Sequence, residues 1–264
     1  MDQLELNKKR PPTALVPASA AVLTMVLVVV GMCLCIDRAN SQRWRNRPRK
    51  SPHEIKFKTG DILLFSGRSF APLPTISFVI KLITNSDISH VGLVWQDPLT
   101  GQHWVWHTSG IPSKAKTVHP KDDKRKHYAH LMTLQEALNP RWGRVYLRPC
   151  SHELDPHRMA QFIRENLGRD YSFDIALHWY NRKLGIAPLH CLETEDGKSG
   201  ATTLTKSSKW SCAELVVNCL CHMGVMPPSE LVAAHSYMPN DFSSNNFLRL
   251  SSDISYGREI YIGT

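Results

Sequence analysis

The chain has 264 residues, of which 42% are hydrophobic and 21% charged, a composition typical of a folded protein and not of a disordered one. The formal net charge of +9 suggests an anionic partner, but no zinc-finger, RNA-recognition or helix-turn-helix pattern accompanies it, so we expect no nucleic-acid partner. Seven cysteines in no framework-like spacing argue against a disulfide-stapled fold and favour a reducing compartment.

The N-terminal part predicts a membrane anchor. After a tail over 1–17, the segment 18–36 contains no charged residue and is long enough to cross a bilayer as a helix. A secretory signal peptide is the alternative, because Lys8, Lys9 and Arg10 precede the apolar run. The run is longer than the usual apolar region of a signal peptide, roughly 7–15 residues, and no small-x-small cleavage site follows it. An uncleaved transmembrane helix is therefore the better prediction.

A basic linker over 37–54 follows this segment. Its positive charges lie close to the apolar run, at Arg38, Arg43, Arg45, Arg47, Arg49 and Lys50. Basic residues favour the cytoplasmic side of a membrane and are attracted to anionic lipid headgroups. We therefore expect a single-pass membrane protein that has the lipid bilayer as a partner and its main domain, 55–264, in the cytoplasm.

The main domain mixes strand and helix patterns, which predicts an α+β fold. The apolar run 62–65 predicts a buried strand, 75–83 a short helix, and 88–108 an antiparallel hairpin. Further along the chain, the patterns predict a helix at 133–138, a strand at 145–147, a helix at 155–168, a long exposed loop at 182–209 and a last strand at 259–262.

The hairpin carries two histidines. If Val94 lies opposite His103, the same register places His90 opposite His107 on one face of the sheet. The two imidazoles would then be cross-strand neighbours, with Cβ atoms about 5 Å apart. A slip of one residue in the register would break this pairing.

A cysteine begins the next strongly predicted helix. Apolar residues recur at helical spacing after Cys212, and Ser211 is a suitable N-cap. The backbone N–H groups and the positive end of the helix dipole favour a thiolate at that position. The alternative is that Cys212 is a small core residue like Cys219.

These residues supply the groups that a cysteine hydrolase or acyltransferase needs. Cys212 is the candidate nucleophile, His90 the base and later the acid, and His107 the group that orients His90. Tyr171 and Trp210 either shape a substrate groove or pack in the core. This chemistry needs no cofactor.

Other histidines and cysteines form two groups in the sequence, and neither has the ligand spacing of a zinc site. They are His119, His127 and His130, and Cys219, Cys221 and His222. We therefore expect no metal and interpret these histidines as scattered surface residues.

Four short motifs occur in a fixed order along the domain: Gly60–Leu64, Ser89–Val94, Leu167–Asp174 and Ser211–Val216. Together they resemble the motifs of permuted papain-like cysteine enzymes of the NlpC superfamily, most closely the YiiX-like branch and more distantly the lecithin–retinol acyltransferase-like enzymes. The resemblance implies a small antiparallel β-barrel packed on the helix that bears the nucleophile. It also implies a carboxylate as third catalytic group in the YiiX-like branch and a second histidine in the acyltransferases, and His107 matches the acyltransferases.

The expected function is that of a membrane-anchored cysteine hydrolase or acyltransferase. It would cleave an amide, ester or thioester through an acyl intermediate on Cys212, with a lipid or a lipid-modified protein as acyl-bearing substrate. One alternative is a peptidase or amidase acting on peptide-like substrates, and another is a catalytically inactive scaffold that binds acyl chains or partners at a membrane.

Overall fold

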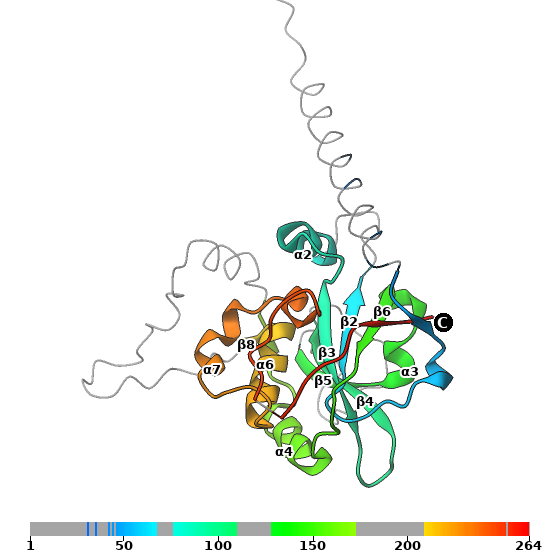
Figure 1. Ribbon diagram of the computed structural model, residues 1–264. Coiled ribbons are helices and arrows are strands. Elements are labelled where there is room, and N and C mark those ends of the chain that lie inside the picture. The colour runs from blue at the N-terminus through cyan, green and yellow to red at the C-terminus, as the bar shows by residue number, and fades with distance from the viewer. Residues whose placement is uncertain are drawn as a thin grey trace, which may run out of the picture.

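The computed structural model describes residues 31, 35, 42, 44, 46–67, 76–109, 128–172, 209–251 and 253–263 (Figure 1). Apart from Gly31 and Cys35, the predicted span over 18–36 lies outside these residues, as does nearly all of the predicted loop over 182–209. Within the described residues, every helix is too short or too polar to cross a membrane.

A mixed sheet forms the centre of the domain, and its described strands follow the order β1-β9-β6-β2-β3-β4-β5-β7-β8. The strands are β1 (Arg49–Lys50), β2 (Ile62–Ser66), β3 (His90–Gln96), β4 (His103–Ser109), β5 (Tyr128–Thr133), β6 (Arg144–Arg148), β7 (Asp170–Tyr171), β8 (Lys209–Trp210) and β9 (Ile260–Ile262). Pairing is antiparallel except between β1 and β9 and between β7 and β8.

The sheet is open, so the prediction of a closed β-barrel is wrong. Its two edge strands, β1 and β8, lie at opposite ends of the strand order and are only two residues long. A barrel needs a hydrogen-bonded ladder between its first and last strands, and no such ladder joins β1 to β8 in the described part of the chain.

The helices lie on both faces of the sheet. They are α2 (Ile76–Thr84), α3 (Leu134–Ala137), α4 (Pro156–Asn166), α6 (Cys212–His222) and α7 (Glu230–Ala233), with short 3-10 turns η1 (Pro52–Glu54), η2 (Pro140–Trp142), η4 (Ala234–Ser236) and η5 (Pro239–Phe242). In Figure 1, α4 and α6 lie on one side of the central strands and α3 on the other. The predicted helix starts are confirmed at α4, where the Asp155 side chain accepts hydrogen bonds from the N–H groups of His157 and Arg158, and at α6.

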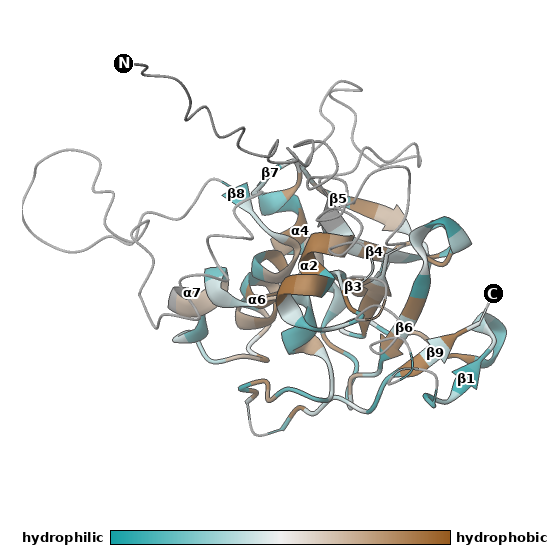
Figure 2. Cartoon of the chain, turned by 90° about the horizontal axis from the view of Figure 1, so that it is seen from above, coloured by the Kyte–Doolittle hydropathy of each residue, from teal (hydrophilic) through white to brown (hydrophobic). Residues whose placement is uncertain are grey.

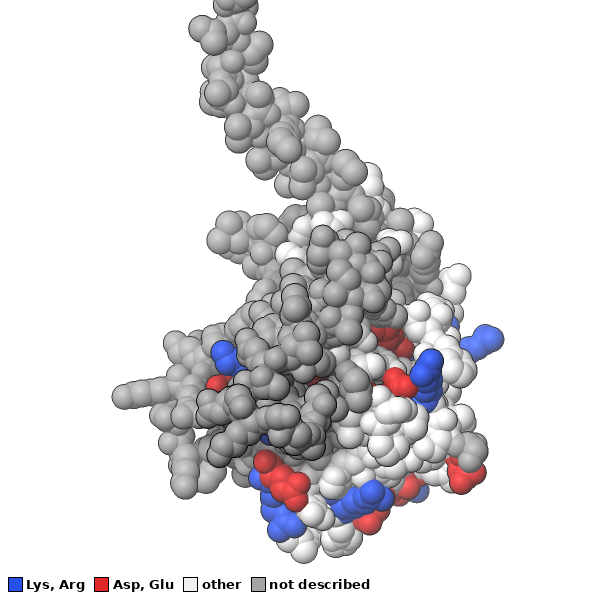
Figure 3. All heavy atoms as spheres, turned by 90° about the vertical axis from the view of Figure 1, so that its left-hand side faces the viewer, with Lys and Arg blue, Asp and Glu red and all other residues white. Residues whose placement is uncertain are grey.

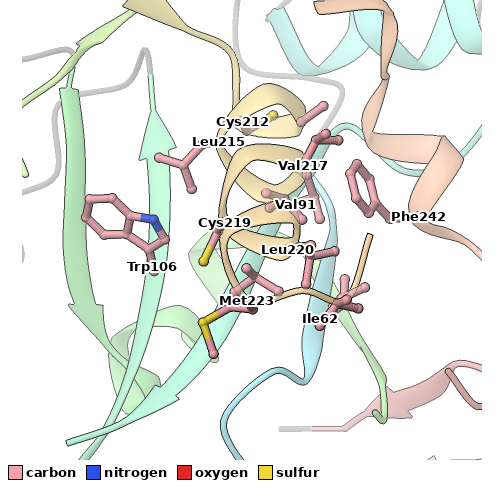
Figure 4. Close-up of a cluster of buried hydrophobic side chains, with 14 of the residues drawn as sticks. Ile62, Val91, Trp106, Cys212, Leu215, Val217, Cys219, Leu220, Met223 and Phe242 are labelled. Carbon is pink, nitrogen blue, oxygen red and sulfur yellow. The ribbon is translucent and has the colours of Figure 1, made fainter. Parts of the chain in front are cut away.

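Alternation along the strands separates two apolar cores. The larger core lies between the sheet and α6 and includes Val91 and Trp106, whereas the smaller core lies on the other face and includes Phe65 and Val94. Figure 4 shows α6 within the larger core, with Trp106 on one side of the helix and Phe242 on the other. The helix that begins with Cys212 is therefore held by tertiary packing along its length.

The first of the four motifs has a structural role. Gly60 has a φ of +96°, and a Cβ at this position would lie 2.5 Å from Leu154 Cγ, so only glycine fits. The buried Asp61 carboxylate accepts hydrogen bonds from the backbone N–H groups of Lys58 (3.0 Å) and Cys150 (2.9 Å). Both residues close the turn that leads into β2.

A buried ion-pair network holds α2 near the sheet. Asp87, whose side chain is fully buried, pairs with Lys81 of α2 at 3.3 Å and with Arg144 of β6 at 2.8 Å. Burial raises the pKa of the Asp87 carboxyl, and the two cations oppose that rise. On its inner side, α2 packs Ile80 in a small apolar cluster with Tyr171 and Met238.

Candidate active site

Cys212 is the first residue of α6, directly after its N-cap. The Ser211 hydroxyl accepts a hydrogen bond from the Glu214 N–H at 3.2 Å, and the Glu214 carboxylate accepts one from the Ser211 N–H at 2.7 Å. This reciprocal capping box confirms the predicted helix start. Glu214, close in sequence to the thiol, therefore serves the helix end.

The surroundings of Cys212 keep its thiol protonated at neutral pH. The residue is 2% exposed, and this burial raises the pKa of the thiol to about 12. The backbone N–H groups of Val91, Ala213 and Cys212 itself oppose the rise, whereas the charge of Glu214 adds to it. The predicted stabilisation of a thiolate at the helix N-terminus is present as the effect of these N–H groups, but burial has the larger effect and raises the pKa of the thiol.

The two histidines of the hairpin meet, in a register that differs from the predicted one. Gln96, and not Val94, lies opposite His103, so the pairing is shifted by two residues. Because strand side chains alternate with a period of two, this shift keeps His90 and His107 on the same face. They become diagonal neighbours, and His90 Nε2 lies 3.0 Å from His107 Nδ1 in a hydrogen bond.

Gly92 makes this diagonal contact possible. A Cβ at Gly92 would lie 2.9 Å from Val105 Cγ1 and 3.2 Å from His107 Cβ. The missing side chain lets the backbone of β3 approach β4 at the point where His107 reaches toward His90. The second motif thus carries a packing requirement as well as a candidate base.

The thiol lies against the strand that carries His90. The Val91 N–H acts on the sulfur of Cys212, and Val91 and Cys212 belong to the same apolar core. The ring of His90 contacts Phe65, whose side chain belongs to the core on the other face, at 5.3 Å between ring centroids. Within the described residues, no hydrogen bond joins the Cys212 sulfur to an imidazole. Successive side chains of a strand point to opposite faces, so the His90 ring points toward the smaller core, whereas Cys212 lies in the larger one, and the two groups are not in direct contact.

A third histidine, His130, belongs to the cluster, and the prediction that it is a scattered surface residue is wrong. It lies directly opposite His107 on β5, with ring centroids 4.2 Å apart, and is 5% exposed. Its Nδ1 donates a hydrogen bond to the Tyr128 carbonyl oxygen at 2.8 Å. The short, mostly apolar run over 128–133, four of whose residues are buried in succession, is the signal that could have identified this strand, but it directly follows a basic stretch of the sequence.

The three imidazoles are neutral at physiological pH. Burial lowers the pKa of His90 to about 3, with a further contribution from the nearby His130. Burial also lowers the pKa of His107 and of His130. In the part of the chain that the structure describes, no group of three His, Cys, Asp or Glu side chains has an arrangement that could hold a metal ion.

Tyr171 and Trp210 lie side by side on the paired strands β7 and β8. Burial raises the pKa of the Tyr171 hydroxyl, and the negative forms of Cys212 and Glu214 raise it further, which places the phenol near the thiol. Trp210 is 3% exposed, stacks on Phe162 at 6.1 Å and lies beneath Arg169 at 3.9 Å. Both aromatic side chains pack in the interior, and of the two Tyr171 is the one that the electrostatics connect to the candidate nucleophile.

Comparison with known proteins leaves the family open. No protein-family model matches the chain, and no curated protein matches it. Among solved structures it is similar to the crystal structure of the metalloprotein yiiX from Escherichia coli O157:H7, with 18% identity and a TM-score of 0.38. The match covers 63% of this chain and 66% of that one, so this chain spans slightly less than two thirds of its length. The function has to be inferred from the residues of this chain.

Proposed function

We propose that this protein is a thiol-dependent hydrolase or acyltransferase that forms an acyl intermediate on Cys212. The observation that supports this function best is the position of Cys212 at the start of α6, against the strand whose His90 is hydrogen-bonded to His107. The candidate nucleophile thus comes from a helix far along the chain from the hairpin that carries the candidate base and orienting group.

The proposed reaction starts from two neutral groups, a thiol and an imidazole. The reaction requires a rearrangement that brings His90 Nδ1 to the sulfur, because the two are not in contact in the structure. As the sulfur then attacks the substrate carbonyl carbon, His90 Nδ1 takes the thiol proton, a C–S bond forms and the carbonyl electrons move onto oxygen. The tetrahedral intermediate then collapses, and the leaving alcohol, amine or thiol takes the proton from His90. Water or a second acceptor repeats these steps on the acyl-cysteine. The Cys212 N–H at the helix N-terminus is a suitable donor to the oxyanion.

An acyl-bearing lipid, or a protein modified with one, is the substrate class that we propose. The helix α2, which contacts Tyr171 through Ile80, exposes Val79 (43%) and Leu82 (40%) on its outer side. Figure 2 shows α2 as one of the most hydrophobic elements of the domain. An apolar helix that packs against Tyr171, whose hydroxyl is electrostatically coupled to the candidate nucleophile, suits the delivery of an acyl chain from a bilayer.

The predicted anchor and basic linker would hold such a domain at a membrane. On the face shown in Figure 3, the described Lys and Arg side chains are interspersed with Asp and Glu. The described basic side chains on that face therefore form no single patch.

The burial of the thiol favours a second candidate function, a catalytically inactive scaffold that binds acyl chains. Cys212 is 2% exposed as a residue, so a substrate cannot reach its sulfur unless neighbouring side chains move. The two functions differ in whether Cys212 becomes acylated.

Labelling with an acylating probe tests the proposal. We expect one acyl adduct per chain, located on Cys212 by mass spectrometry, and none in Cys212→Ala. Cys219→Ala is the matched control, because Cys219 is equally buried on the same helix and should leave labelling unchanged. His90→Ala should slow labelling by about 10²- to 10⁴-fold.

Two results would contradict this function. Labelling that persists in folded Cys212→Ala would refute the nucleophile, and a wild-type protein that binds acyl chains without acylation would support the scaffold. Comparing phospholipid vesicles with acylated peptides as acyl donors separates a lipid enzyme from a peptidase or amidase.

A further inference from the structure

The buried histidine cluster contains one more member than the proposed chemistry uses. His130 contacts His107 directly across β4 and β5, and His107 contacts His90 across β3 and β4. The three rings thus form a row that crosses three strands and ends at the candidate base. In such a row, the hydrogen bond made by one nitrogen of each ring determines whether the other nitrogen carries a proton.

The hydrogen bond at the far end of the row sets the tautomer of His130. A carbonyl oxygen only accepts, so His130 Nδ1, which lies 2.8 Å from the Tyr128 carbonyl oxygen, carries the proton. His130 is buried and neutral, and its Nε2 therefore presents a lone pair. This Nε2 is buried and has no hydrogen-bond partner.

The middle ring has a matching unpaired atom. His107 Nδ1 is occupied by His90 Nε2, and His107 Nε2 is buried without a partner. The rings of His107 and His130 lie 4.2 Å apart between centroids. Buried polar atoms left unpaired are costly, and a hydrogen bond between the two Nε2 atoms would satisfy both.

Trp142 is the competing partner. Its indole N–H is also buried and unpaired, and its ring lies 6.1 Å from that of His107, farther than His130. An indole N–H can only donate, so a hydrogen bond from Trp142 would require a lone pair on His107 Nε2. The proton of His107 would then sit on Nδ1, and His90 would have to present a lone pair on Nε2.

We propose that His130 is a positioning residue that accepts a hydrogen bond from His107 Nε2–H and thereby sets the tautomers of the whole row. With the proton of His107 on Nε2, its Nδ1 accepts from His90 Nε2–H. His90 is then left with a lone pair on Nδ1, the form that a base for the Cys212 thiol requires. The effect of these tautomers on catalysis rests on the proposed function, whereas the tautomers themselves can be tested without it.

Nitrogen-15 NMR of the full-length protein in detergent micelles, labelled at histidine, tests this assignment near neutral pH. We expect wild-type His107 and His90 as Nε2–H tautomers and His130 as the Nδ1–H tautomer. His130→Phe should shift His107 and His90 away from the Nε2–H form. His130→Gln, whose amide oxygen can accept the same hydrogen bond, should retain it.

Trp142→Phe is the matched control and should leave all three tautomers unchanged. A wild-type His107 in the Nδ1–H form, or a tautomer change in Trp142→Phe and none in His130→Phe, would overturn the proposal. If His130→Phe does not fold, the wild-type spectrum and the Gln variant still decide the question.

The acylation assay gives the second readout. We expect His130→Phe to slow acylation of Cys212 on the order of tenfold, the size of effect that loss of one hydrogen bond produces, and His130→Gln to restore the rate. The predicted tautomers in a protein that shows no acylation would refute the proposed function and leave the role of His130 intact. If His130→Phe has altered tautomers but acylates Cys212 at the wild-type rate, the tautomers set by His130 are not needed for acylation.

Discussion

At the residue scale, Cys212 shows two opposing effects on one thiol. A helix N-terminus stabilises a negative charge by at most about 2 kcal/mol. The pKa of the thiol nevertheless rises from its ordinary 9.0 to about 12, a net change of about 4 kcal/mol whose largest cause is burial and in which the N–H groups are already counted. Burial therefore prevails, and the thiol needs a base such as His90 to react at neutral pH.

Glu214 offers a direct test of this balance. In Glu214→Gln the amide can still accept the hydrogen bond from the Ser211 N–H, but the negative charge beside the thiol is removed. Since that charge raises the pKa of Cys212, we expect the thiol pKa to fall. The pH dependence of Cys212 alkylation measures this change.

Glu214→Ala is the companion variant for stability. It loses the capping hydrogen bond as well as the charge, and it should destabilise the protein by about 1 kcal/mol more than the Gln variant in chemical denaturation. An alkylation profile of Glu214→Gln that is unchanged, or moved to higher pH, would contradict the assigned effect of the carboxylate.

At the scale of elements, the β3–β4 hairpin depends on Gly92. We expect Gly92→Ala to destabilise the protein by about 1–3 kcal/mol, because the added methyl group meets Val105 and His107 in a packed core. The same displacement should weaken the His90–His107 hydrogen bond, which slows acylation and changes the His90 imidazole signals in NMR.

Gly101→Ala is the control for this prediction. Gly101 lies in the hairpin loop with a φ of +71°, so alanine there costs about 1–2 kcal/mol of backbone strain, while its Cβ meets only Gln96 Nε2 at 4.0 Å. It should lower stability without changing the His90 signals. Equal effects of the two variants on His90 would show that hairpin stability, and not the close approach at Gly92, controls the site.

At the scale of the whole molecule, the buried histidines make stability depend on pH. An unfolded histidine is protonated below about pH 6.5, whereas burial lowers the pKa of His107 and His130 in the folded protein. The unfolded chain therefore binds more protons below that pH, and folding stability falls as the pH falls. Each of the two residues contributes a slope of at most about 1.4 kcal/mol per pH unit.

Denaturant titrations at pH 7.5 and 5.5 measure this loss. We expect the wild type to lose stability on acidification and His130→Phe to lose less. Burial raises the pKa of Asp61 and Asp87, which acts in the opposite direction at lower pH, so the comparison of variants isolates the histidine. An equal loss in both proteins would contradict the neutral, buried state of His130.

Local rules allowed part of this molecule to be predicted. The N-cap and first turn of α6 depend on Ser211 and Glu214, three residues apart, and the shared face of His90 and His107 depends on the period of two in a strand. Both were predictable because backbone geometry and short-range hydrogen bonds determine them. The assignment of Cys212, His90 and His107 to catalysis stays a prediction.

By itself, then, the sequence determined where the helices begin, which strand residues share a face, and which side chains are able to carry thiol chemistry. Only the tertiary structure decided the register of the hairpin, the open sheet, the inclusion of His130 in the histidine row and the burial of the thiol. These features depend on strand pairing and packing between residues far apart in the chain, and such contacts leave no local pattern from which they can be derived.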